Sequence, residues 1–142
     1  MNKMALFPRK VKFRKWQRGR KNLKLVRVAT RGKNLSFGAF GLKSETMGEI
    51  KVNQIEAARK VMARFTQKGG KTWIRIFADK PVTQKAAEVG MGQGKGDPVG
   101  FIASVKPGTI IFEIDGLDEK SSKEALRKAG SKLPVKTKII AR

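Results

Sequence analysis

The sequence predicts an α+β fold: a compact set of mixed or antiparallel strands, two helices packed on them, a basic N-terminal extension and one long glycine-rich loop. The expected elements follow the order strand, helix, several strands, helix, strand, which differs from the repeating strand–helix units of an α/β protein. Residues 1–44 contain fourteen Lys and Arg and no acid, and residues 79–98 show no periodicity. A length of 142 residues fits one domain, 1–142.

The first expected elements are two strands and a helix. The segment 35–43, LSFGAFGLK, mixes glycine with aromatic residues, which indicates a strand with a bulge or a close backbone approach. A short strand over 49–52 is expected next. Asn53 and Glu56 have the spacing of a helix capping box, and Gly69-Gly70 supplies the stop.

This helix has two distinct faces. Its apolar stripe, expected in the core, is Ile55, Ala58, Met62 and Phe65. Its basic face is Lys60, Arg64 and Lys68. The pattern favours neither phosphate contact nor simple solvation for the basic face.

Three further strands are expected over 71–77, 99–105 and 109–114, because these segments are rich in aromatic and β-branched residues. Lys106-Pro107-Gly108 places proline and glycine in the order of a type II turn. We therefore expect the strands on either side of this turn to form a hairpin.

A second helix and a last strand complete the expected domain. Ser121 and Glu124 have capping-box spacing, and Pro134 would end the helix. Its core-facing residues are Leu126, Ala129 and Leu133. The segment 135–140, VKTKII, alternates in the manner of a strand.

The charge balance indicates a polyanionic partner. The chain has 33 Lys and Arg against 11 Asp and Glu, a formal charge of +22. Repulsion on this scale opposes compaction unless a polyanion balances it. Nucleic acid is the first candidate and an anionic membrane surface the second, although no run approaches the ~20 apolar residues of a membrane span. The absence of cysteine fits a reducing compartment.

The composition also argues against catalysis. The chain has no His, Cys or Tyr, so the commonest general base, the thiol nucleophile and the usual soft metal ligands are missing. The tightest acidic group is interpreted as a strand end and a first helical turn: Glu113, Asp115, Asp118 and Glu119. We expect no enzyme, no catalytic residue, no metal site and no cofactor. An enzyme acting on RNA would require clustered carboxylates or a metal.

Residues 1–24 are predicted to form a nucleic-acid-binding arm. Phe13 and Trp16 are spaced among basic residues, and their rings can stack on bases or fill a groove. A solvated basic tail is the alternative. The residues expected to bind are Arg9, Lys10, Lys12, Phe13, Arg14, Lys15, Trp16, Arg18 and Arg20.

The loop 79–98 contains a glycine at every second position from Gly90 to Gly96. Neither the dinucleotide fingerprint nor the P-loop matches this spacing, and both motifs require a helix where a strand is expected here. Loops of this length inside a domain are usually functional. We interpret the loop as a finger that reaches a partner by shape and backbone contact, with an idle solvent-exposed loop as the alternative.

Seven motifs occur in an order that resembles the family of bacterial-type large-subunit ribosomal protein number sixteen. They are PRKVKFRK…RGR, SFGAFGLK, QIEAARKVMAR, WIRIFADKPVT.K, MGQGKG, VKPG…FEIDG and AL.KA.SKLPVKTK, and together they span residues 8–138. The resemblance implies a structural constituent of the large subunit that binds rRNA near the central protuberance. It also implies roles in late subunit assembly and in tRNA positioning during translation.

The resemblance further implies site residues and partners. The arm would be embedded in rRNA, and the loop would point toward tRNA and the peptidyl-transferase centre through Lys80, Lys85, Gly90, Met91, Gly92, Gln93, Gly94, Lys95 and Gly96. Three positions depart from the family pattern: Ala78 replaces a common proline, Gly90 an arginine and Gln93 a basic residue.

The implied partners are large-subunit rRNA, tRNA and neighbouring large-subunit proteins, in a cytoplasmic or organellar ribosome. No membrane partner and no homo-oligomer are expected. On composition alone, a nucleoid-type DNA-binding protein is the main rival.

Overall fold

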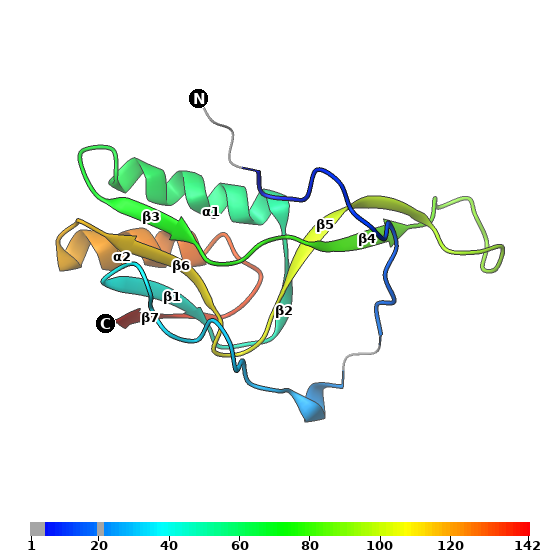
Figure 1. The fold of residues 1–142 in the computed structure, drawn as a ribbon, viewed down its shortest axis with the longest axis horizontal. Coiled ribbons are helices and arrows are strands. Elements are labelled where there is room, and N and C mark those ends of the chain that lie inside the picture. Colours follow the sequence, from blue (N-terminus) through cyan, green and yellow to red (C-terminus); the bar gives the residue numbers. More distant parts are fainter. Residues whose placement is uncertain (1–4, 20–21) are drawn as a thin grey trace.

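The computed structural model describes residues 5–19 and 22–142, which form two antiparallel sheets and two helices (Figure 1). The α+β prediction is therefore confirmed. One sheet has the strand order β3-β6-β1-β7 and the other has the order β2-β5-β4. In chain order, the elements are a 3-10 turn (Leu23–Leu25), β1 (Phe40–Ser44), β2 (Gly48–Lys51), α1 (Val52–Phe65), β3 (Lys71–Ile74), β4 (Lys80–Gln84), β5 (Asp97–Val105), β6 (Ile110–Asp115), α2 (Glu119–Gly130) and β7 (Thr137–Ala141).

The two helices pack against each other beside the four-stranded sheet and bury their apolar faces there (Figure 1). The predicted stripe of α1 is confirmed, because Ile55, Ala58 and Met62 are buried and Phe65 packs against the core. In α2, Leu126 and Ala129 are buried as expected. Strand β6 crosses the middle of this core and is buried over most of its length.

Both helices begin earlier than the sequence predicts. The N-cap of α1 is Lys51, whose backbone N–H donates to Oε1 of Gln54 at 2.9 Å, so the predicted Asn53 cap is wrong. The N-cap of α2 is Asp118, whose carboxylate accepts from the backbone N–H of Ser121 at 3.0 Å. A carboxylate one turn upstream therefore replaces the predicted Ser121 cap.

The predicted hairpin around Lys106-Pro107-Gly108 is wrong, although the turn itself is present. Gly108 has φ +95°, and the N–H of Thr109 donates to the carbonyl of Lys106 at 3.2 Å. Strands β5 and β6 nevertheless lie in different sheets. Type II turns do not match the twist of a two-residue hairpin, so the strands diverge and the chain passes between the sheets.

The segment 79–98 is shorter as a loop than the sequence predicts. Residues Lys80–Gln84 form β4, which pairs antiparallel with β5 between Asp97 and Ile102. The irregular part is therefore residues 85–96. The β4–β5 hairpin extends away from the helices and the four-stranded sheet (Figure 1).

The segment before β1 is held by a buried carboxylate. Glu113 lies in the last half of β6, near the strand end where the sequence placed it, and its side chain is fully buried. It accepts from the N–H groups of Phe37 and Gly38, both at 2.7 Å, and from Ser36 at 3.1 Å. It also forms an ion pair with Arg75. A close backbone approach was predicted here: a Cβ on Gly38 would lie 2.6 Å from the carbonyl oxygen of Ile114.

The surroundings of Glu113 favour its charged form. Burial raises the pKa of its carboxyl group, but the three N–H donors and the Arg75 guanidinium outweigh burial and hold the pKa below its ordinary value. The ionised carboxylate therefore stabilises the fold at neutral pH. Because the pKa is lowered in the folded chain, this stabilisation is complete above the unfolded value of ~4.3 and is lost as the pH falls through the folded value.

We expect Glu113→Gln to lower the free energy of unfolding at pH 7 by about 2–4 kcal/mol, because the amide leaves the Arg75 charge without its carboxylate. The difference from the unmodified chain should shrink as the pH is lowered from 5 to 3. Urea unfolding at pH 7, 5 and 3 measures it.

Glu119→Gln is the matched control, since Glu119 is exposed and pairs along its own helix with Lys123. Its effect should stay within about 0.5 kcal/mol. Equal stability of the two variants at pH 7 would contradict the assigned role of Glu113.

Candidate nucleic-acid interface

The N-terminal arm runs along the three-stranded sheet and beside the β4–β5 hairpin (Figure 1). At its start, the rings of Phe7 and Phe101 stack with centroids 6.0 Å apart and planes 10° apart. Further along, Nζ of Lys95 donates to the carbonyl of Trp16, and Nζ of Lys15 donates to the carbonyl of Lys95 at 3.2 Å. The arm and the hairpin thus contact each other at both ends of the arm's described path.

Glu49 on β2 ties the arm to the sheet. Its side chain is only 11% exposed, and its two oxygens accept from Arg18 of the arm at 2.5 Å and from Lys80 of β4 at 3.3 Å. One carboxylate therefore joins three segments that are distant in sequence. Glu49 was not predicted from the sequence; its position as one of the first acids after 44 acid-free residues was the available signal.

The predicted arm residues within the described chain are all exposed, whereas Arg20 lies outside it. Phe13 is 62% and Trp16 is 42% exposed, so both rings are accessible to a partner. The ammonium of Lys12 lies 5.5 Å from the centroid of the Phe13 ring. Within the described residues of the arm, the cations with no carboxylate in ion-pair range are Arg9, Lys10, Lys12, Arg14 and Lys15.

The structure divides the cations of the arm into two kinds. Arg18 is held by Glu49 and acts as a tether of the arm. The others keep their charge available to an external polyanion. We name the exposed face formed by residues 7–19 and 85–96 the arm–hairpin surface.

The glycine run contains glycines with different structural requirements. A Cβ on Gly96 would lie 2.5 Å from the backbone carbon of Gln84, so Gly96 is required by close packing of the hairpin. Gly92 and Gly94 have φ +98° and +93°, and Gln93 between them has φ +58°. These three residues make a left-handed turn that favours glycine. Gly90 faces open space and has neither restriction.

The basic residues predicted for the loop lie in three different environments. Lys80 belongs to β4, is half-buried and pairs with Glu49, so its assignment to the loop is wrong. Nζ of Lys85 donates to the carbonyl of Gly92 and closes the turn. Lys95 contacts the arm. The tip itself presents Met91, which is fully exposed, between uncharged neighbours.

Two other kinds of site are absent from the ranges 5–19 and 22–142. No helix there has the length and apolar character needed to cross a bilayer. In the same ranges, no three potential ligand side chains are grouped to hold a metal ion.

Gly96 and Gly90 offer a matched pair of substitutions. We expect Gly96→Ala to destabilise the hairpin by about 1–3 kcal/mol, because the methyl group would overlap the Gln84 backbone. Gly90→Ala should change stability by less than about 0.5 kcal/mol. Amide hydrogen exchange over Lys80–Gln84 measures the hairpin directly. Equal protection in the two variants would contradict the close packing at Gly96.

A comparison with protein families gives a match that spans nearly the whole chain. The model for ribosomal protein L16p/L10e matches residues 8–140. The match includes most of the arm, both helices and the β4–β5 hairpin.

Proposed function

The chain belongs to the ribosomal protein L16p/L10e family and is a structural constituent of the large ribosomal subunit. We propose that it binds rRNA near the central protuberance of that subunit and that the arm–hairpin surface makes the contact. This is a family of structural proteins rather than enzymes, and it associates with rRNA and other ribosomal proteins in translation. The ribosome that contains it is cytoplasmic or, in some cases, organellar.

The observation that carries the proposal is the contact between the arm and the hairpin. Lys95 and Lys15 each donate to a backbone carbonyl across the two segments, and Glu49 holds the arm through Arg18. The free cations of the arm are thereby presented from a defined position instead of from a loose tail. Lys and Arg contacts to phosphate fix the position of a protein on a nucleic acid, and they supply most of its salt-dependent affinity.

The exposed aromatic residues add a second kind of RNA contact. Phe13 and Trp16 lie on the arm among its cations and keep much of their ring surface exposed. Unstacked RNA bases bind to aromatic side chains in this way. We propose that these two rings anchor the arm within folded rRNA.

The tip of the hairpin is proposed to make a different contact from that of the arm. Residues 85–96 project from the body, and we propose that they point toward tRNA and the peptidyl-transferase centre (Figure 1). Gly90, Met91 and Gln93 leave the tip without charge. Its contacts are therefore made through shape and backbone, while the arm supplies the electrostatic attraction. Insertion of both segments into rRNA supports late subunit assembly.

Binding to a large-subunit rRNA fragment should depend steeply on salt. We expect the affinity to fall log-linearly by ~10³ or more between about 50 and 200 mM salt if roughly six to ten phosphates are contacted. Replacing Arg9, Lys12 and Arg14 together with alanine should reduce the slope by about one for each phosphate that the variant no longer binds. Filter binding across a salt series is the measurement.

A control variant removes the same charge from the other side of the fold by replacing Lys120, Lys136 and Lys138, which are exposed on or near α2 and β7. Its slope should stay close to that of the unmodified protein. A flat salt dependence, or an equal reduction of the slope in the two variants, would refute binding by the arm. Equally tight binding of duplex DNA would favour a nucleoid-type function.

A further inference from the structure

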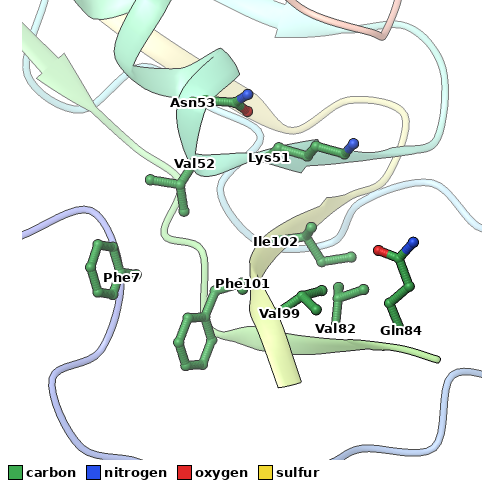
Figure 2. Close-up of a pocket in the computed structure, with 10 residues that line it drawn as sticks. Phe7, Lys51, Val52, Asn53, Val82, Gln84, Val99, Phe101 and Ile102 are labelled. Atoms are coloured by element: carbon green, nitrogen blue, oxygen red, sulfur yellow. The ribbon is translucent and has the colours of Figure 1, made fainter. Parts of the chain in front are cut away.

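An open groove lies on the three-stranded sheet between the arm and the start of α1 (Figure 2). Its volume is about 570 Å³, which is room for a nucleotide. Strands β4 and β5 supply its apolar floor through Val82, Val99 and Ile102. The groove is separate from the cations of residues 9–18 and from the hairpin tip.

One wall of the groove is aromatic. Phe101 of β5 stacks on Phe7 of the arm, and the two rings are nearly parallel. Phe7 is 50% exposed and Val99 is 61% exposed, so apolar surface of the stack and of the groove floor remains in contact with solvent. Removing such surface from water is favourable by about 25 cal/mol per Å², and an exposed apolar patch rimmed by polar groups marks a binding site.

The opposite end of the groove is polar. Figure 2 shows the ammonium of Lys51 and the amide of Gln84 on the side of the groove away from Phe7. An amide has both a donor and an acceptor, which suits the edge of a base. The lysine supplies a positive charge for a neighbouring phosphate. A flat apolar slot, a donor–acceptor group and a cation together match the chemistry of one nucleotide.

We propose that this groove binds one unpaired nucleobase of the rRNA, with its ring against the Phe7–Phe101 pair, its polar edge at Gln84 and its phosphate near Lys51. The proposal rests on the rRNA-binding function given above and adds a base-reading site to it. The formal charge of +22 and the neighbouring arm favour a polyanion over an apolar protein segment as the occupant.

The test compares two RNA probes that carry equal charge. Full-length protein is titrated at about 150 mM salt with octauridylate and with an abasic ribose–phosphate octamer, using fluorescence anisotropy. Base stacking of about 1–3 kcal/mol corresponds to roughly 5- to 150-fold tighter binding of octauridylate. Phe101→Leu should reduce this preference and leave the affinity for the abasic probe unchanged, because Phe101 lies outside the arm–hairpin surface. Phe7→Leu should also reduce the preference, and Phe13 and Trp16 supply the part that remains.

Phe77→Leu is the matched control, because Phe77 is 49% exposed and does not line the groove. It should leave both affinities unchanged. Phe7→Leu lies on the arm outside the core, so its result holds even if Phe101→Leu proves unstable. Gln84→Leu should alter the order of affinity among octamers of uridine, adenosine and cytidine without affecting the abasic probe.

The outcomes separate this proposal from the proposed function. Equal binding of the two probes with a steep salt dependence would overturn the nucleobase site and leave electrostatic rRNA binding intact. An undiminished base preference in both phenylalanine variants would also overturn it. Absence of binding to either probe would contradict both proposals.

Photo-crosslinking of assembled large subunits identifies what occupies the groove. Large subunits containing 4-thiouridine should give a crosslink between rRNA and the β5 peptide that contains Phe101. A protein crosslinker that joins this peptide to another ribosomal protein, with no rRNA adduct there, would overturn the proposal in favour of a protein occupant.

Discussion

Mutual repulsion among the basic side chains is the constraint on which the rest of the structure depends. With 33 Lys and Arg and only 11 Asp and Glu, few carboxylates are available to oppose it. Two of these carboxylates join segments that are distant in sequence. Glu113 holds the segment before β1 against the core, and Glu49 holds the arm against the three-stranded sheet. Glu56, Glu119 and Glu124 form ion pairs along their own helices.

This distribution separates the cations that hold the fold from those that we propose bind rRNA. Arg18, Arg75 and Lys80 are engaged by carboxylates, whereas the cations at the start of the arm face solvent. We propose that rRNA supplies the counter-charge for the cations of the arm. The family match gives rRNA as the associated polyanion, and the exposed cations of the arm are the residues that we propose contact it.

Local patterns predicted the parts of the fold that depend on neighbours in sequence. The apolar stripe of α1 and the turn at Pro107-Gly108 were predicted correctly. The predicted hairpin after that turn was wrong, because strand pairing depends on the whole sheet. Strand β4 was missed because only its pairing with β5 makes the segment KPVTQ a strand. The contact of Glu49 with the arm and the close packing of Gly96 on Gln84 were not predicted, since they join residues distant in sequence. The ordered motifs nevertheless identified the family.

The most direct test of a single arm–hairpin surface is amide hydrogen exchange of the arm in Glu49→Gln, measured together with rRNA affinity. If Glu49 holds the arm in position, exchange over residues 14–19 should become faster and affinity should fall about threefold or more, although the substitution removes a negative charge. Unchanged exchange with an affinity that rises, as expected from the charge alone, would contradict the account.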